Sequence, residues 1–248
     1  MNLILLATLL LQQGDFEKKL DELIPRLKAE SIAERDKAQQ DLHALVMKTG
    51  ANARPILRAR IAKSGSPALD EILLKAIRLL PTLEMKLETL GQAQVGKTAR
   101  FKARIRNIGD ETVSIVGSLD GSDSSLRFPL VKVEALGPDG KEREIDVTPR
   151  MCGNCARLQE WNVSTLHPGE ELDPFGPDLR NARHLREWKP SETGKHTLKL
   201  TMDFSAIDAS EWNSRPERTD MDLEKAAQIL ARIPRVKLTA QVEIDVIK

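Results

Sequence analysis

The spacing of hydrophobic residues changes near Pro81. Before that residue, apolar side chains recur every three or four positions, which is the period of an amphipathic helix. After it they mostly alternate with polar ones, as they do from Phe101 to Ile105, which is typical of a strand with one buried face. The sequence therefore predicts an α+β protein of two domains, with a helical domain over residues 15–81 and an antiparallel β domain over residues 84–248.

Four helices are predicted in the first domain. Ser31 and Glu34 form a capping box that opens the second helix, and Gly50 closes it. Pro67 suits the first turn of the fourth helix. The apolar residues expected on the helix faces are Phe16, Leu20, Leu23, Ile24, Leu27, Ala38, Leu42, Leu45, Val46, Ile56, Leu57, Ile61, Leu69, Leu73, Ile77 and Leu80.

These helices have the pattern of two copies of one hairpin. At an offset of 34 residues Leu23 matches Leu57, and a unit of this length is typical of stacked helical repeats. The stretch from Ile24 to Leu80 resembles HEAT-like repeats, and its segment LIPRLKAESIAERDKAQQDLHAL is similar to helix pairs in exported proteins of planctomycete-type bacteria. The resemblance implies a face that binds another protein, and the alternative is a spacer or cap.

Four segments of the second domain carry strand and turn signals in the same order as a known fold. They are GKTARFKARIRNIGDETV, VKVEALGPDGKE, STLHPGEEL and GKHTLKLTMDF. This order resembles immunoglobulin-like domains of bacterial exported proteins, and it implies an antiparallel sandwich in which His196 replaces a common Tyr. Residues 205–233 fit a helical insertion before the last strand, and Trp212 is the candidate interaction residue there.

The first eleven residues, Met1 to Leu11, are almost entirely apolar. This run is too short to span a bilayer, which needs roughly 20 residues. It fits a secretory signal peptide over residues 1–14, and the alternative is an apolar first helix that belongs to the fold. We therefore expect an exported protein, periplasmic or extracellular, without an integral membrane segment.

Cys152 and Cys155 are the only cysteines. In an exported protein an even cysteine count favours a disulfide, which would stabilise this small loop by roughly 2 kcal/mol. The same spacing would also suit a metal site, which would need further ligands, and His167 and His184 are available. A redox pair and two free thiols are also compatible with the spacing.

The composition argues against several classes of function. The net charge of +1 and the scarcity of aromatic residues indicate no nucleic-acid partner. Gly91 to Thr98 reads GQAQVGKT and matches the phosphate-loop pattern, but the alternating segment that follows predicts a strand where that loop needs a helix. We therefore predict no nucleotide binding and no cofactor. No nucleophile-elbow or H-E-x-x-H motif is present, so no catalytic residue is assigned.

These observations together predict an exported, non-enzymatic protein-interaction or envelope-scaffolding module. A second hypothesis is a redox or metal-binding module built on Cys152 and Cys155. A third is a protease inhibitor or a carbohydrate-binding sandwich, for which Trp161, Trp188 and Trp212 are the available aromatic platforms.

Overall fold

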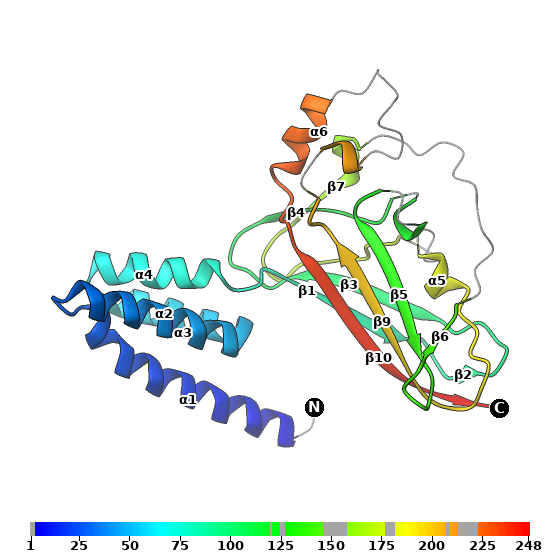
Figure 1. The fold of residues 1–248 in the computed structure, drawn as a ribbon, viewed down its shortest axis with the longest axis horizontal. Helices are drawn as coiled ribbons and strands as arrows, with labels where there is room; N and C mark the ends of the chain where they lie inside the picture. Colours follow the sequence, from blue (N-terminus) through cyan, green and yellow to red (C-terminus); the bar gives the residue numbers. More distant parts are fainter. Residues whose placement is uncertain are drawn as a thin grey trace. The chain divides into compact units, whose positions relative to one another are not determined.

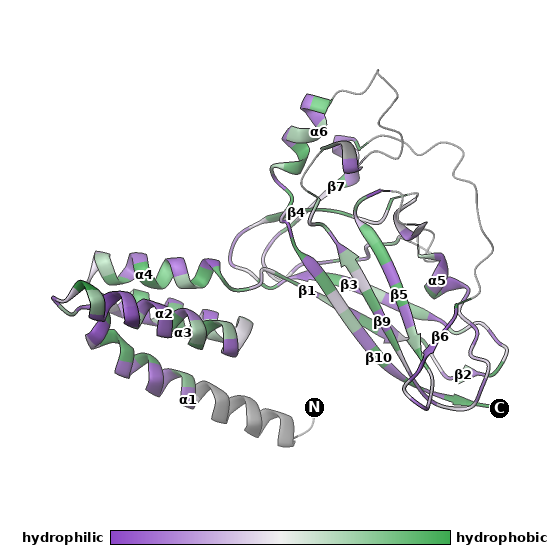
Figure 2. Cartoon of the chain, in the orientation of Figure 1, coloured by the Kyte–Doolittle hydropathy of each residue, from purple (hydrophilic) through white to green (hydrophobic). Residues whose placement is uncertain are grey.

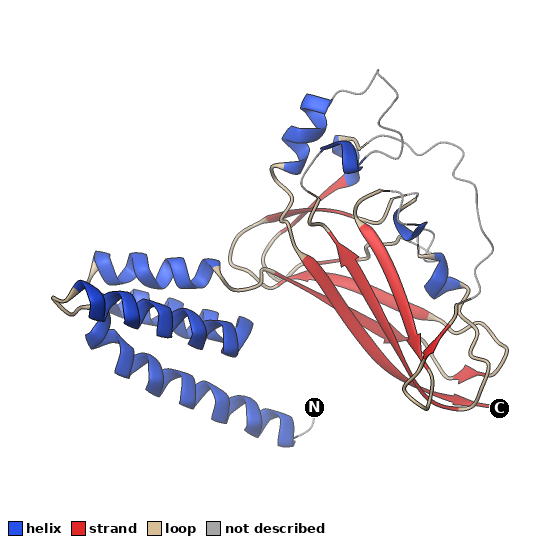
Figure 3. Cartoon of the chain, viewed as in Figure 1, coloured by secondary structure: helices blue, strands red, loops and turns tan. Residues whose placement is uncertain are grey.

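The computed structural model describes residues 3–119, 121–124, 127–145, 158–176, 182–206, 209–212 and 223–248. The chain divides into two compact units, Met1–Thr82 and Leu83–Lys248. The first unit is helical and the second contains the strands, as Figures 1 and 3 show. The predicted α+β organisation, with helices first and sheets second, is confirmed.

The described residues of the first unit, 3–82, form four α-helices and one short 3-10 turn. Their bounds are α1 Leu3–Leu27, α2 Ile32–Thr49, η1 Gly50–Asn52, α3 Ala53–Ser64 and α4 Pro67–Arg78. The expected apolar faces meet in one core, and Phe16, Leu42, Leu57 and Leu73 are among its fully buried members. The apolar run at the start of the chain and the predicted first helix form a single helix in the structure.

The helix ends follow from local hydrogen bonds. The Ser31 hydroxyl accepts from the amide of Glu34 at 3.4 Å and begins α2. Gly50 ends α2 with a φ of 66°, a value that glycine adopts without steric strain. Ser66 caps α4, and Pro67 occupies its first turn. These three predicted helix boundaries agree with the structure.

The described residues of the second unit form two larger sheets and a two-stranded ribbon. The first sheet has the order β1-β3-β8, the second the order β2-β10-β9-β5-β6, and the ribbon pairs β4 with β7. The bounds are β1 Leu83–Thr89, β2 Ala93–Gln94, β3 Phe101–Asn107, β4 Val113–Val116, β5 Leu130–Leu136, β6 Glu142–Arg143, β7 Val163–Leu166, β8 Glu171–Leu172, β9 Gly194–Asp203 and β10 Lys237–Ile247. Among the described strands, β2 pairs with β10 in parallel and the other pairs are antiparallel.

The two larger sheets pack as layers around one core. Alternate residues of β3, such as Ala103 and Ile105, are buried, and so are Leu198 and Leu200 of β9. These residues belong to one hydrophobic cluster. Figure 2 shows the alternation of hydrophobic and hydrophilic residues along β9 and β10. Burial of one face of each sheet explains why the period of two was visible in the sequence.

Short helices fill the connections between strands. They are η2 Ser122–Ser124, η3 Glu160–Asn162, α5 Arg183–Arg186, η5 Ala209–Trp212 and α6 Leu223–Leu230. Both η5 and α6 lie between β9 and β10, where the sequence predicted a helical insertion. The α6 helix buries Ala226 and Ile229.

Candidate functional site

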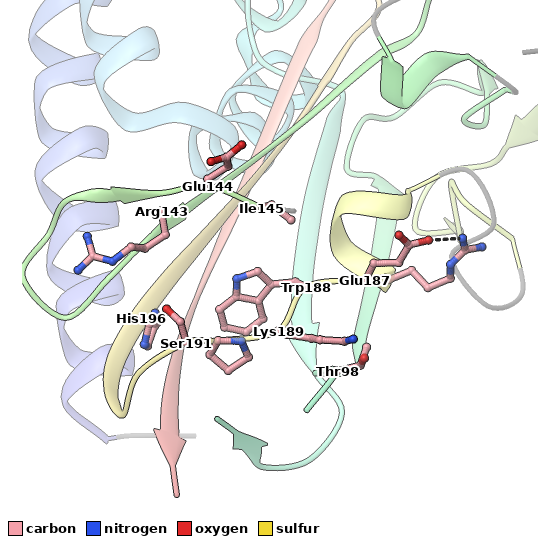
Figure 4. Close-up of a pocket in the computed structure, with 11 residues that line it drawn as sticks. Thr98, Arg143, Glu144, Ile145, Glu187, Trp188, Lys189, Ser191 and His196 are labelled. Carbon is pink, nitrogen blue, oxygen red and sulfur yellow. Dashed lines mark hydrogen bonds and ion pairs between the residues drawn. The ribbon is translucent and has the colours of Figure 1, made fainter. Parts of the chain in front are cut away.

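A pocket of about 610 Å³ lies in the β unit, beside the first residues of β9. Its walls come from the segment before β3, from β6 and the two residues that follow it, from the last residue of α5 and the segment after it, and from β9 (Figure 4). The lining residues are Thr98, Arg143, Glu144, Ile145, Arg186, Glu187, Trp188, Lys189, Pro190, Ser191 and His196.

Backbone hydrogen bonds and ring packing hold the segment after α5 in place. The Trp188 carbonyl accepts from the amide of Ala99 at 3.1 Å, and the Pro190 carbonyl accepts from the amide of Gly96 at 2.9 Å. The Trp188 ring lies 5.8 Å from the ring of Phe101 and 5.8 Å from that of His196, the latter edge-on at 70°. Trp188 therefore forms a structural wall of the pocket.

Arg143 connects the β5–β6 hairpin to the segment just before β9. Its guanidinium donates to Glu192 at 2.9 Å and to Asp139 at 2.8 Å. The pKa of Asp139 lies below its ordinary value because the Lys141 amide and the Arg143 guanidinium donate to the carboxylate. The pKa of Arg143 is raised, chiefly by its hydrogen bond to Glu192. The charge of Arg143 is thus balanced within the protein.

Two further pocket cations differ in their pairing. Arg186 donates to Glu187 at 2.9 Å, a pair drawn as a dashed line in Figure 4, and this bond is the main reason that the pKa of Glu187 is lowered. Lys189 is exposed. Within the described part of the chain, its ammonium group has no ion-pair partner.

His196 is the buried polar residue of the pocket, with 1% of its surface exposed. Its Nε2 lies 3.0 Å from the carbonyl oxygen of Glu192. Its Nδ1 is buried and has no hydrogen-bond partner among the residues that the structure describes. The sequence placed His196 on a strand, but nothing in its spacing indicated a pocket.

The segment that matches the phosphate-loop pattern has another geometry. The amides of Val95, Gly96, Lys97 and Ala99 all donate to backbone carbonyls. A phosphate loop needs such amides free to bind its ligand. The next regular element is the strand β3, as the sequence predicted. Thr98 contributes to the pocket wall instead.

The three tryptophans differ sharply in exposure. Trp212, the candidate interaction residue, is 1% exposed, and its ring lies 6.2 Å from that of Phe128. Trp188 is 3% exposed, whereas Trp161 is 80% exposed. Trp212 therefore lies in the core and is not available as a contact surface. The exposed tryptophan is Trp161. From the sequence it was one of three possible aromatic platforms, and no signal distinguished it from the other two.

Local hydrogen bonds hold Trp161 on η3. The Asn162 side chain accepts from the amide of Gln159 at 2.9 Å, and the Gln159 carbonyl accepts from the amide of Asn162 at 2.9 Å. Glu160 accepts from Arg232, which follows α6, at 2.7 Å. Strand β7 begins directly after η3. The indole is thus carried by a hydrogen-bonded turn next to a strand.

The cysteine and metal hypotheses involve other parts of the chain. Cys152 and Cys155 lie outside the described residues. His167 Nδ1 lies 3.1 Å from the hydroxyl of Thr112, and His184 lies on α5. Among the described residues, no group of three or more His, Cys, Asp or Glu side chains could hold a metal ion. In the same residues, no helix has the length and apolar character needed to cross a membrane.

Comparisons with known proteins find weak structural similarity and no matching family. No family model matches the chain, and no curated protein matches it. Two solved structures of the CARDB domain of PF1109 from Pyrococcus furiosus are 14% identical to the chain and cover 67% of it, with a TM-score of 0.24. The alignment spans 94% of the solution NMR structure and 89% of a crystal structure in complex with di-metal ions. Such a score is too low to establish a shared fold.

Proposed function

We propose that this chain is a non-enzymatic protein-interaction module whose contact surface is centred on Trp161. The observation that carries the proposal is the 80% exposure of this indole. Single exposed aliphatic residues are ordinary on protein surfaces, but tryptophan has a large apolar area and is enriched among the residues that dominate binding energy. An exposed tryptophan on an ordered turn is therefore a natural anchor for a partner.

The surroundings of Trp161 support this role. Glu160, Asn162 and Arg232 place polar groups around the turn. In protein interfaces, a central aromatic anchor surrounded by polar residues is a common arrangement. Because hydrogen bonds already order the turn, less conformational entropy is lost when a partner binds.

The finer fold assignments belong to the same proposal. We assign α1–α2 and α3–α4 to two HEAT-like hairpins, supported by short connections within each pair and by a shared core. We assign the β unit to an immunoglobulin-like sandwich, supported by its two packed layers of mainly antiparallel strands. An exported scaffold in the periplasm or outside the cell fits this combination.

The proposal is tested with purified full-length protein and an extract of envelope proteins. Partners captured by the wild type are identified by mass spectrometry, purified, and titrated against variants. Trp161→Ala should weaken binding at least tenfold, a loss of about 1.4 kcal/mol or more that is typical of an anchor residue. Trp161→Phe should retain more affinity than Trp161→Ala because an aromatic face remains.

Met47→Ala provides the matched control, because Met47 is a large exposed apolar residue of the helical unit. Its affinity should equal that of the wild type. If every captured partner binds Trp161→Ala as tightly as the wild type, the interaction surface lies elsewhere. A glycan array with the same variants distinguishes a protein partner from a carbohydrate ligand.

A further inference from the structure

Positive charge is concentrated where the chain enters β3. Arg100 and Lys102 are exposed, and they alternate with Ala99 and Phe101, which are buried. The two cationic side chains therefore project from the same outer face of the sheet, and their Cα atoms are about 7 Å apart, as in any extended strand. Because both side chains are long, they can pair with one carboxylate at the same time.

The described part of the chain leaves both of these charges without an ion-pair partner. Glu88 lies opposite Lys102 in the register of β1 with β3, but its carboxylate accepts from Arg104, at 3.5 Å. Arg104 is paired in addition with Glu171, at 2.9 Å. The cations of β3 that face β1 and β8 are thus neutralised, whereas the pair at the start of the strand is available to a partner.

The same two cations line a second pocket, of about 390 Å³. Leu90 also lines it, and this side chain is 44% exposed. The Leu90 amide donates to the Arg100 carbonyl at 2.8 Å, which fixes the leucine beside the arginine. Asp173, on the other side of the strand, lines the pocket as well, and its carboxylate accepts from the amide of Phe175 at 3.0 Å. Exposed apolar surface next to two cations suits an acidic group that has an aliphatic neighbour.

Further cations lie beside this second pocket. Thr98 and Arg186 line both this pocket and the pocket beside β9. Figure 4 shows the Lys189 side chain extending toward Thr98, and Lys97 directly precedes Thr98 in the chain. Arg186 is paired with Glu187. The exposed cations here that have no ion-pair partner in the described residues form a basic surface, which consists of Lys97, Arg100, Lys102 and Lys189.

We propose that the basic surface binds an acidic segment of a partner protein. Carboxylates of the segment pair with Arg100 and Lys102, and an aliphatic side chain next to them contacts Leu90. The net charge of the whole chain is only +1, so the attraction comes from this local cluster and selects a complementary acidic partner. The proposal goes beyond the surface centred on Trp161, which is not among the residues that line either pocket.

The test uses a fluorescein-labelled peptide of sequence GELEGELEG, whose binding to full-length protein is followed by fluorescence anisotropy. A second peptide has serine in place of leucine, and a third has lysine in place of glutamate. The first peptide should bind at least threefold more tightly than the serine peptide and at least tenfold more tightly than the lysine peptide. Its affinity should fall when NaCl is raised from about 0.05 M to about 0.5 M, because salt screens exposed charges.

Two double variants with the same loss of charge test the location. Arg100→Ser/Lys102→Ser should weaken binding of the first peptide at least tenfold. Arg235→Ser/Lys237→Ser is the matched control, since it removes an exposed arginine and an exposed lysine at the same spacing, and neither lines the two pockets. The control should change the Kd less than twofold. Arg100→Glu/Lys102→Glu should reverse the preference and bind the lysine peptide more tightly than the first peptide.

A further variant and a competitor test the class of partner. Leu90→Ser should bind the first peptide only as tightly as the wild type binds the serine peptide. Polygalacturonate supplies carboxylates without aliphatic side chains, so at equal carboxylate concentration it should displace the peptide only in part. Absence of peptide binding, equal losses in the two serine double variants, an unchanged affinity in Leu90→Ser, or complete displacement by polygalacturonate would overturn the proposal. Trp161→Ala should bind the peptide like the wild type, so a failure here leaves the Trp161 proposal intact.

Discussion

The buried side chain of Asn107 joins three segments of the β unit. Its amide nitrogen donates to the carbonyls of Glu111 (2.7 Å) and Leu166 (2.9 Å), and its Oδ1 accepts from the amide of Gly109 (2.8 Å). Asn107→Ala leaves these three backbone groups without partners, so the free energy of unfolding should fall by about 2–4 kcal/mol in urea denaturation. Asn52→Ala is the control, because the Asn52 side chain makes no capping hydrogen bond. Equal losses in the two variants would contradict this role.

The exposure of Trp161 gives a second prediction at the same scale. Because Trp188 and Trp212 are 3% and 1% exposed, most fluorescence that acrylamide can quench should come from Trp161. Trp161→Phe should therefore shift the emission maximum to shorter wavelength and remove most of the quenchable signal. Trp212→Phe should leave the quenchable fraction unchanged. An unaltered spectrum in Trp161→Phe would show that this indole is covered in solution.

At the scale of elements, helix capping gives a prediction for the first unit. The Ser31 hydroxyl satisfies one amide at the start of α2. Ser31→Ala should lower the stability of the helical unit by about 1 kcal/mol, followed by circular dichroism at 222 nm during urea denaturation. Ser31→Asp should retain wild-type stability, because aspartate also caps helices and favours a helix N-terminus. Equal destabilisation by both substitutions would argue against a capping role.

At the scale of elements, some features could be predicted from the sequence and others could not. Capping residues and turns depend on hydrogen bonds within a few residues, so Ser31, Gly50 and Pro67 could be placed from sequence. Strand pairing could not, because it depends on distant partners: Ile105 pairs with Leu172, for example. Edge strands of two residues, such as β8, are too short to show a period.

The candidate sites were hardest to predict because they depend on tertiary packing. The polar residues around Trp212 in the sequence suggested an accessible side chain. In the structure its ring lies against Phe128, and nothing in the local sequence indicates this contact. The pocket joins Thr98, Arg143 and His196, which no motif connects. The available signal was His196 itself, a histidine on the apolar face of β9 that needs a polar partner once it is buried.

At the scale of the whole molecule, the two units have separate cores. Among the residues whose burial the structure describes, the core of the first unit lies between Phe16 and Leu80 and that of the second between Leu83 and Val246. A fragment of residues 83–248 should therefore fold alone and keep the β-sheet circular dichroism spectrum of the full chain. A fragment of residues 1–82 should melt at a lower temperature, because so small a domain buries less of its surface. An unfolded 83–248 fragment would show that its core needs the helical unit.

Export is the remaining prediction for the whole chain. The described buried residues of α1 begin at Phe16, so removal of residues 1–14 would leave the described helical core intact. In protein from an exporting host, intact mass should show loss of about this segment. If thiols are alkylated before any reduction, Cys152 and Cys155 should both stay unmodified, because an oxidising compartment favours their disulfide. A full-length chain with two alkylated thiols would contradict export and would make metal binding by the two cysteines the next hypothesis to test.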